Sequence, residues 1–371
     1  MQVRLGDYVL IKTGKLDANI ASENGRFPFF TCGVEPLKID KYSYDCECVL
    51  VAGNGDLNVK YYYGKFDAYQ RTYIIESKNK NLLSVKYLYF FLDNYLDTLR
   101  NEAIGGVIKY IKLSNLSEVK IKLLDLEKQL EIVNILEKIN LLISLRKNQL
   151  KKLDELVKSR FIEMFGDPLL NPYNLISVKL GTVLAVEPQN GLYKPQSDYV
   201  VDKSGIPILR IDSFYNGQLR NLNSLKRLNC SDIEKKRYLL KENDIVINRV
   251  NSIEYLGKCA LITGLVEDTL FESNMMRLHV DETKYNPVYV TYLLCSKFIY
   301  NQILSMAKKA VNQASINQKD VENFEIYMPN LNLQNKFADF VKQTDKSKLE
   351  IQKSLDKLEI LKKSLMQQYF G

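Results

Sequence analysis

One long segment of this chain occurs twice, and that repetition limits the possible folds more than any other feature. The segment from Leu126 to Gly166 aligns without a gap with the segment from Leu331 to Gly371, at an offset of 371 minus 166, or 205 residues. Ten of the 41 aligned positions are identical, including Gln129 with Gln334. We therefore expect two copies of one structural unit.

Weaker similarity continues upstream of both segments. KYLYFFL from Lys86 aligns with VYVTYLL from Val288, and VRLG at Val3 aligns with VKLG at Val178. The last pair has an offset of 178 minus 3, or 175, so the second copy gains 205 minus 175, or 30 residues, in between. Each copy is therefore expected to be a variable globular domain followed by a repeated segment.

Both repeated segments have the seven-residue apolar spacing of one long helix. Asp125 and Asn330 precede them, where a short acceptor side chain can cap the first backbone amides. Thr344 and Lys348 interrupt the second apolar stripe. We expect the stripe residues to pack between the helices: Ile132, Leu136, Ile139, Ile143, Leu150, Leu153 and Val157 in the first segment, and Phe337, Val341, Ile351, Leu355, Leu358 and Leu365 in the second.

A helix of this length is about 60 Å long at roughly 1.5 Å per residue, so its apolar stripe needs a long partner. The two segments can supply each other by packing antiparallel, and the alternative is separate helices that mediate homodimerisation. The fold prediction is α+β, with two globular α/β domains at residues 1–120 and 167–325. Two long antiparallel coiled-coil helices, at 121–166 and 326–371, separate them in an internal pseudo-twofold repeat.

Within the globular domains, three apolar runs predict buried strands. They are CVLVAGNG near Cys48, YIIES at Tyr73 and DIVINRVN near Asp244. The spacing of apolar residues from Leu88 to Leu99 predicts an amphipathic helix.

A formal net charge of +8 and 24 tyrosines favour a polyanionic partner. Arginine, asparagine and glutamine can bind base edges, whereas lysine and tyrosine mostly anchor phosphates. GGVIKYIK at Gly105 and AKKAVNQASINQK at Ala307 occupy equivalent repeat positions before the long helices. We expect a loop at Tyr61–Arg71 and further loops in the second domain to contact DNA. The candidate DNA-binding residues are Tyr62, Tyr63, Lys65, Tyr69, Gln70, Arg71, Lys109, Lys112, Lys194, Arg210, Arg220, Arg249, Asn251, Ser252, Lys258, Arg277, Lys308, Lys309, Asn312 and Gln313.

Catalytic motifs are missing from the sequence. NPVY at Asn286 lacks the second proline of an adenine-methyltransferase loop and instead suits the start of a helix, and GNG at Gly53 is too short for a nucleotide-binding loop. His279 is the only histidine, and Cys46 and Cys48 have no common zinc spacing, so we expect no metal and reduced, buried thiols. No run of about 18 apolar residues occurs, which predicts a cytoplasmic protein without a membrane partner.

Taken together, the arrangement resembles the specificity subunits of type I restriction-modification systems over essentially the whole chain. The resemblance is carried by VRLGDY and VKLGTV at the domain starts, GKFDAYQRTYII at Gly64, LLKENDIVINRVNS at Leu239, LGKCALI at Leu256, FESNMMRL at Phe271, and the helix ends FIEMFGDP and LMQQYFG. The family pattern is a variable target-recognition domain and a conserved helix, each occurring twice.

This resemblance implies a non-catalytic chain that recognises a bipartite, asymmetric sequence in double-stranded DNA. It also implies a complex with two methyltransferase subunits, which use S-adenosylmethionine at adenine N6, and with restriction subunits that translocate DNA using ATP and Mg²⁺. The chain itself is expected to bind no cofactor. The alternatives are a coiled-coil scaffold without a role on DNA and a fused restriction-methylation enzyme, for which two repeats within the 371 residues are expected to leave no room.

Overall fold

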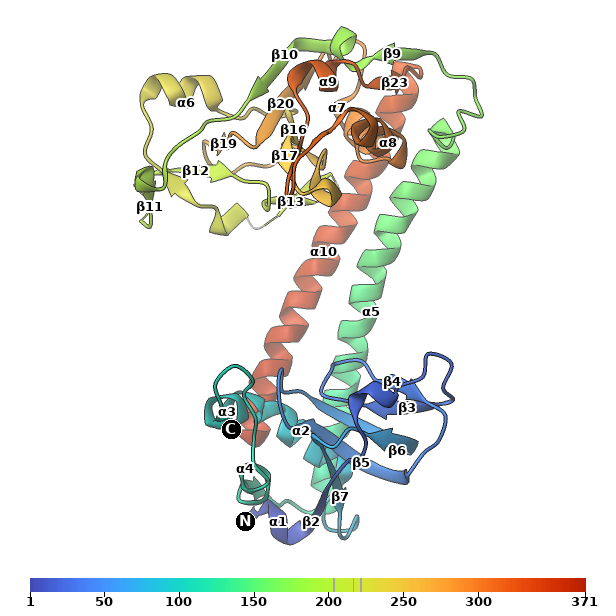
Figure 1. Cartoon of the computed structure of the whole chain (residues 1–371), viewed down its shortest axis with the longest axis vertical. Coiled ribbons are helices and arrows are strands. Elements are labelled where there is room, and N and C mark those ends of the chain that lie inside the picture. The colour runs from blue at the N-terminus through green and yellow to red at the C-terminus, as the bar shows by residue number, and fades with distance from the viewer. Residues whose placement is uncertain (203, 216, 221) are drawn as a thin grey trace. The chain divides into compact units, whose positions relative to one another are not determined.

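The computed structural model of the chain describes residues 1–202, 204–215, 217–220 and 222–371, which form two compact units. Unit 1 comprises Met1–Leu150 and Glu350–Gly371, and unit 2 comprises Lys151–Leu349. The long helices α5 (Leu126–Phe165) and α10 (Leu331–Phe370), green and red in Figure 1, each contribute residues to both units. The C-terminal end of the chain therefore completes unit 1.

Unit 1 is built on a sheet with the strand order β2-β7-β5-β6-β3-β4. β5 pairs antiparallel with β6 and β7, while β3 pairs parallel with β6. The expected strands near Cys48 and Tyr73 are confirmed as β5 and β7. The strands are β1 (Gln2–Arg4), β2 (Val9–Thr13), β3 (Phe27–Phe30), β4 (Leu37–Ile39), β5 (Tyr44–Ala52), β6 (Val59–Ala68), β7 (Thr72–Ser77) and β8 (Lys120–Lys122), and the short helices are α1 (Leu5–Tyr8), α2 (Val85–Asn94), α3 (Leu96–Glu102) and α4 (Ser114–Ser117).

The helix expected from Leu88 to Leu99 is divided into α2 and α3. At Tyr95 the backbone has φ −85° and ψ −3°, and its N–H donates to the carbonyls of both Phe91 and Asp93. This shared hydrogen bond closes the last turn of α2, so that α3 starts as a separate helix at Leu96.

Unit 2 contains two four-stranded sheets, with the orders β10-β20-β16-β18 and β11-β15-β12-β19. The expected strand near Asp244 is confirmed as β16, and Asn286 caps α7 with Pro287 in its first turn, as predicted. The strands are β9 (Ser177–Lys179), β10 (Leu184–Asn190), β11 (Tyr199–Val200), β12 (Ile206–Leu209), β13 (Phe214–Tyr215), β14 (Gln218–Leu219), β15 (Arg227–Leu228), β16 (Ile245–Asn248), β17 (Val250–Asn251), β18 (Cys259–Leu261), β19 (Leu270–Phe271), β20 (Met275–Val280), β21 (Lys308–Lys309), β22 (Ala314–Ser315) and β23 (Glu325–Tyr327), and the short helices are α6 (Asp232–Tyr238), α7 (Pro287–Leu294), α8 (Lys297–Met306) and α9 (Gln318–Glu322).

The two units repeat the same strand register at their beginnings and ends. In unit 1, β1 pairs antiparallel with β8 and places Val3 opposite Ile121. In unit 2, β9 pairs antiparallel with β23 and places Val178 opposite Ile326. These partners differ by 175 and 205 residues, the two offsets found in the sequence, so the repeat is confirmed at the level of individual residue pairs.

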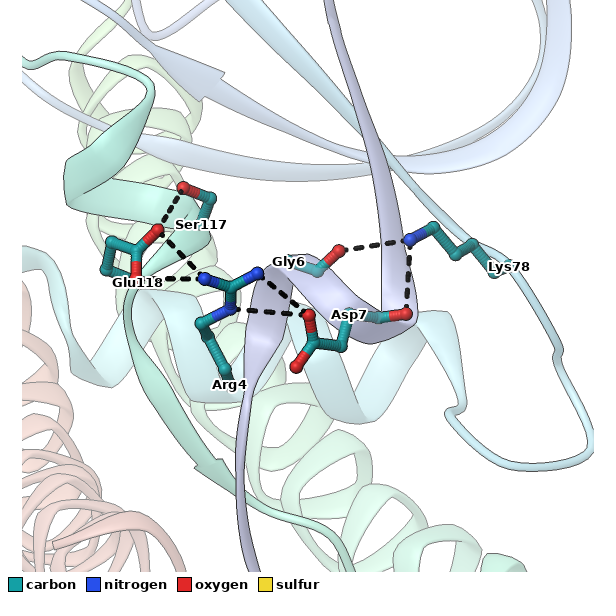
Figure 2. Close-up of polar contacts among 6 residues, drawn as sticks. All are labelled: Arg4, Gly6, Asp7, Lys78, Ser117 and Glu118. Carbon is teal, nitrogen blue, oxygen red and sulfur yellow. Dashed lines mark hydrogen bonds and ion pairs between the residues drawn. The ribbon is translucent and has the colours of Figure 1, made fainter.

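A polar contact beside this strand pair also occurs in both units. Figure 2 shows the Arg4 guanidinium between Asp7, at 3.0 Å, and Glu118, at 3.4 Å, with Lys78 Nζ donating to the Gly6 and Asp7 carbonyls. Its counterpart in unit 2 is the hydrogen bond from Lys179 Nζ to Asn323 Oδ1, at 2.8 Å. Each contact joins the start of a globular domain to its last segment.

Glycine is required next to both of these contacts. A Cβ atom on Gly6 would lie 2.9 Å from the Ser117 carbonyl oxygen, and one on Gly181 would lie 3.0 Å from the Glu322 side chain. The shared Leu-Gly pair of the two domain starts therefore has a packing reason, because any side chain would push α1 away from α4 and its counterpart away from α9.

A buried glutamine connects each long helix to the globular part of its unit. Gln129 is 0% exposed; its Oε1 accepts from the Ser84 N–H at 2.9 Å, and its Nε2 donates to the carbonyls of Leu82 and Leu124. In unit 2, Gln334 is also 0% exposed and makes the equivalent bonds, to the Asn286 N–H at 2.8 Å and to the carbonyls of Lys284 and Pro329. The amide group fits because it donates and accepts at once.

A tyrosine makes a second repeated contact between the short helices and the strands. The Tyr87 hydroxyl of α2 donates to the Lys122 carbonyl at 2.9 Å, and the Tyr289 hydroxyl of α7 donates to the Tyr327 carbonyl at 3.1 Å. The alignment of KYLYFFL with VYVTYLL in the sequence places these two tyrosines at the same position, and the structure gives them the same role.

In each unit the ends of α5 and α10 lie side by side and antiparallel. In unit 1, Lys147 pairs with Glu359 at 3.1 Å, while Leu136 and Met366 share the core with β5 and α2. In unit 2, Lys348 pairs with Asp154 at 2.7 Å, and Phe161 stacks edge-on against Phe337. All the stripe residues expected from the sequence are buried or half-buried.

The two polar interruptions of the second stripe are satisfied within unit 2. The Lys348 side chain is 14% exposed and also contacts Asp345 at 3.3 Å, and the buried Thr344 hydroxyl donates to the Phe340 carbonyl at 2.9 Å. At the start of α10, Asn330 Oδ1 accepts from the Asn332 N–H at 2.8 Å, which is the expected cap.

Candidate nucleic-acid interface

A β-hairpin precedes the long helix in both units, at the positions where the sequence places basic clusters. In unit 1, Ile104 and Tyr110 exchange both backbone hydrogen bonds, at 3.0 and 2.8 Å. Gly105 turns the chain with a φ of +118°, and a Cβ there would lie 2.6 Å from the Ile108 carbonyl oxygen. In unit 2, β21 and β22 form the hairpin, closed by the hydrogen bond from the Ala310 N–H to the Gln313 carbonyl at 2.7 Å.

The residues after the buried central strand pair with each hairpin, as a short strand in unit 2 and as a single bridge in unit 1. In unit 2, β17 follows β16 and pairs antiparallel with β22. In unit 1, Asn54 follows β5 and forms the matching antiparallel bridge to Tyr110. The base of the hairpin is thus joined by backbone pairing to the segment that follows the core strand in both units.

A cleft of 490 Å³ lies beside the hairpin of unit 1. Polar and basic residues converge there from two loops: Lys15 after β2, and Gln70 and Arg71 between β6 and β7. Lys109 and Lys112 flank the cleft residue Ile111 in the sequence, and both are exposed. Gln70 Nε2 already donates to Asp17 at 2.8 Å, so this amide is occupied. The groups that can bind an anion here are the cationic side chains of Lys15, Arg71, Lys109 and Lys112.

In unit 2 the hairpin itself lines a cleft of 330 Å³ together with the turn after β17. Lys309, Asn312 and Gln313 are exposed residues of this cleft, and Ser252 and Glu254 lie on its opposite wall. Lys308 is exposed next to Lys309. Amide and ammonium groups therefore share one surface, as recognition of base edges and phosphates requires.

Two tyrosine rings hold a further cation of unit 2 in place. Lys258 Nζ lies 4.0 Å from the centroid of Tyr215 and 3.7 Å from that of Tyr255, and the Arg220 guanidinium lies 5.1 Å from the Tyr215 ring. Stacking of this kind orders the cations without neutralising them, because an aromatic face carries no net charge.

Several sequence candidates make internal contacts instead. Lys194 pairs with Glu234 at 3.0 Å and Asp198 at 3.4 Å, and the bond to Glu234 raises the pKa of this lysine. Arg210 lies 3.4 Å from Glu272, a carboxyl whose pKa burial raises. The ion pairs of Lys194 and Arg210 therefore join neighbouring segments of unit 2 to one another.

Two further arginines also bind backbone carbonyls. Arg277 donates to the Leu239 carbonyl at 2.8 Å and to the Gln189 side chain, and Arg249 donates to the Ser273 carbonyl at 2.9 Å. The Asn251 Oδ1 accepts a hydrogen bond from the Ser252 N–H at 2.8 Å. Both arginines are half-buried, and Arg277 also lies 3.9 Å from the buried carboxylate of Asp244.

The loop expected at Tyr61–Arg71 is wrong for its first part, because Tyr61 to Lys65 lie on strand β6. Pairing with β5 from Val59 to Phe66 overrides the polar character of this segment. Tyr62 packs against Phe30 and Phe66, and Lys65 lies over the Tyr42 ring, whose hydroxyl raises the pKa of the lysine. The prediction of a loop is also wrong for Arg277, which lies on β20, and for Asn251, which lies on β17.

Tyr63 is 72% exposed on β6, and Tyr69 is half-buried at the strand end, where its N–H donates to the Phe30 carbonyl. The sequence prediction missed Lys15 and the ring pair Tyr215 and Tyr255. Only the tertiary structure brings Lys15 into the same cleft as Arg71. In the sequence, the Gly14-Lys15 pair after an apolar strand was a usable signal for a basic loop.

Three further features concern metal binding, thiols and membrane-spanning helices among the residues that the structure describes. No group of three or more histidine, cysteine, aspartate or glutamate side chains there could hold a metal ion. The cysteines described are free. The expected burial is confirmed for Cys48 and Cys259 and is wrong for Cys295, which is exposed, while Cys32, Cys46 and Cys230 are half-buried. Among the helices of the described ranges, none is long and apolar enough to cross a membrane.

A family model for the type I restriction modification DNA specificity domain matches residues 1–155 and 176–361. Each match runs from a domain start into a long helix, in agreement with the repeat. The chain is 34% identical over 156 residues to the EcoDI specificity subunit of a type I restriction enzyme from Escherichia coli, which covers 42% of this chain and 34% of that protein. It is 32% identical over 184 residues to the putative MjaX specificity subunit from Methanocaldococcus jannaschii, covering 49% of this chain and 42% of that one.

The matched stretches thus span less than half the length of these two relatives. A third relative, the MjaVIII specificity subunit of the same archaeon, is 22% identical over 391 residues and is covered to 90%. Among solved structures, the S subunit of a type I restriction-modification system from M. genitalium superposes with a TM-score of 0.63 at 16% identity, over 100% of this chain and 96% of that one. This likeness shows a shared fold.

Proposed function

Because the chain belongs to the type I restriction modification DNA specificity family, we propose that it is the subunit that reads a bipartite, asymmetric sequence in double-stranded DNA. In this role it performs no catalysis and binds no cofactor. It assembles with two methyltransferase subunits, which supply S-adenosylmethionine, and with restriction subunits, which supply ATP and Mg²⁺.

The observation that carries the proposal is the duplicated hairpin. In both units the segment after the buried core strand pairs with this hairpin, and exposed lysines lie on or beside it. A non-DNA scaffold would need the long helices but has no use for two equivalent basic hairpins. Each unit is therefore assigned one half of the target sequence, with Arg71, Lys109 and Lys112 in unit 1 and Lys258, Lys308, Lys309, Asn312 and Gln313 in unit 2 as its first contacts.

The half-buried arginines and Lys194 take a supporting role in this proposal. Their ion pairs and carbonyl contacts fix the strands from which the contact residues project. A guanidinium held by a carboxylate has less charge to offer a phosphate, so substitution of Arg210 should act mainly through stability.

We further propose that α5 and α10 form one antiparallel coiled coil that sets the gap between the two half-sites. The contacts in each unit support this, because both helices take part in both cores. The outer face of α5 supports the partner proposal: Leu141, Leu142 and Leu145 are 59%, 43% and 49% exposed and would dock a methyltransferase helix. At the equivalent positions, α10 carries Lys346, Ser347 and Glu350, so a second subunit would meet a more polar surface.

The test is methylome sequencing of a strain that carries this chain with its methyltransferase subunits. We expect one bipartite methylated motif. Replacing the unit 2 hairpin, residues 307–315, with that of a relative should change one half of the motif only, and replacing residues 104–110 should change the other. A motif altered in both halves by one exchange would contradict the assignment of one unit to each half-site.

A gel shift at low and moderate salt separates this function from the scaffold alternative. The assembled complex should bind a duplex carrying its motif at both salt concentrations, whereas a scaffold would bind this duplex at neither. Whole-domain exchanges should include the helix ends, since Leu136 and Met366 belong to the core of unit 1.

A further inference from the structure

The tips of the two hairpins expose aliphatic side chains to water. In unit 1 Val107 is 104% exposed and Ile108 is 63% exposed, and in unit 2 Val311 is 99% exposed. Single exposed apolar residues are ordinary on a protein surface. Here they recur at the tip of the same element in both repeats, although the two tip sequences, GGVIK and AVNQA, share no aligned valine.

Backbone hydrogen bonds join the base of each hairpin to the rest of its unit. The Gly55 N–H donates to the Lys109 carbonyl at 3.0 Å, and the Ile111 N–H donates to the Gly53 carbonyl at 2.9 Å. In unit 2, β17 and β21 bind β22 from its two sides. A hairpin anchored at its base loses less conformational entropy on binding than a free loop would, which favours its use as a contact element.

The charge around the tips indicates what covers them. Residues 104–112 contain two lysines and no carboxylate, and residues 307–315 likewise contain two lysines and no carboxylate. The one carboxylate of the neighbouring cleft is Glu254. A partner that presents anions on both sides of an apolar strip fits this pattern, and a DNA groove does so, with phosphates at its edges and thymine methyl groups and base edges on its floor.

We propose that the two hairpin tips enter a groove of the DNA and pack against base edges, with Val107 and Ile108 reading one half-site and Val311 the other. The flanking lysines hold phosphates, and the amides of Asn312 and Gln313 lie next to Val311, where they can bind an adenine edge. This inference rests on the proposed function, and it assigns to the tips the apolar part of sequence readout.

The test compares Val311→Ser with Lys308→Gln plus Lys309→Gln in the complex of the full chain with its methyltransferase subunits. Binding to a duplex carrying the methylated motif is measured against salt concentration. Val311→Ser should weaken binding about tenfold without changing the salt dependence, because no counterion is released at an apolar contact. The double lysine variant should make the negative slope of log K against log salt shallower by about 1.8, because each lost phosphate contact removes roughly 0.9 from its magnitude.

Val266→Ser is the matched control, since this valine is 83% exposed in the loop between β18 and β19 of the same unit. It should bind like the wild type. The same comparison in unit 1 uses Val107→Ser plus Ile108→Ser, with Val34→Ser as the control, because Val34 is also exposed.

A second measurement identifies the contacted groups. Thymines of one half-site are replaced in turn by deoxyuridine, which lacks the methyl group; if a tip packs on that methyl group, the replacement should weaken the wild type and leave the matching serine variant unaffected. Unchanged affinity of Val311→Ser, with the motif still recognised, would overturn the inference and leave the proposed function intact. Loss of methyltransferase assembly with unchanged DNA affinity would also overturn it, because the tip would then be a protein contact. Absence of any motif-specific binding by the wild-type complex would instead refute the proposed function.

Discussion

Replacing Gln334 by methionine tests whether the repeated glutamine anchors each long helix to its globular domain. Methionine has a similar length and shape, so the packing is kept while the amide is lost. The substitution leaves three groups without their partner: the Asn286 N–H, bound at 2.8 Å, the Pro329 carbonyl, bound at 2.9 Å, and the Lys284 carbonyl, bound at 3.4 Å.

The magnitude follows from these three bonds. A buried polar group left unpaired costs about 1–3 kcal/mol, and the long bond to Lys284 contributes at the low end. We therefore expect the free energy of unfolding of unit 2 to fall by about 3 kcal/mol. Gln334→Glu should do no better, because a carboxylate keeps the bond to the Asn286 N–H but turns its second oxygen toward two carbonyls.

Amide hydrogen exchange measured by mass spectrometry reports this loss locally. Peptides that cover 284–294 should exchange about a hundredfold faster in Gln334→Met, since 1.4 kcal/mol corresponds to about a factor of ten. Peptides that cover 82–94 should be the ones affected in Gln129→Met, which is the matched variant of unit 1. If Gln334→Met changes neither the free energy of unfolding nor the exchange near Asn286, the reasoning about the buried amide is wrong.

Two further predictions concern pH and the length of the helices. Burial raises the pKa of Tyr87 to about 12, so the contribution of its neutral hydroxyl to stability is complete below the ordinary value of 10 and is lost as the pH rises through 12. The free energies of unfolding at pH 8 and pH 11 should therefore differ less in Tyr87→Phe than in the wild type. Equal differences in the two proteins would contradict this. Deleting residues 147–153 from α5 and 351–357 from α10 keeps the seven-residue phase and shortens each helix by about 10 Å at roughly 1.5 Å per residue. The methylome should then show a gap about three base pairs shorter, at ~3.4 Å per base pair, or no methylation; an active enzyme with an unchanged gap would refute the coiled-coil spacer.

The sequence by itself determined the features that depend on local patterns. The seven-residue apolar period and the repeat offset predicted the doubled domain and the two long helices, which begin just after Asp125 and Asn330. Apolar runs predicted β5, β7 and β16. The identity of Gln129 with Gln334 marked a shared position, but not its role, because the bond to Asn286 joins residues 48 apart.

The tertiary structure alone decided which polar residues remain available to DNA. Lys194 and Arg210 look like Lys308 and Lys309 in the sequence, yet Glu234 and Glu272 occupy the first two, and those partners come from other elements of unit 2. Tyr62 was expected in a loop, but pairing of β6 with β5 turned it into the core beside Phe30. Long-range pairing fixes these outcomes, and it is encoded in the packing of the whole unit rather than in the spacing of neighbouring residues.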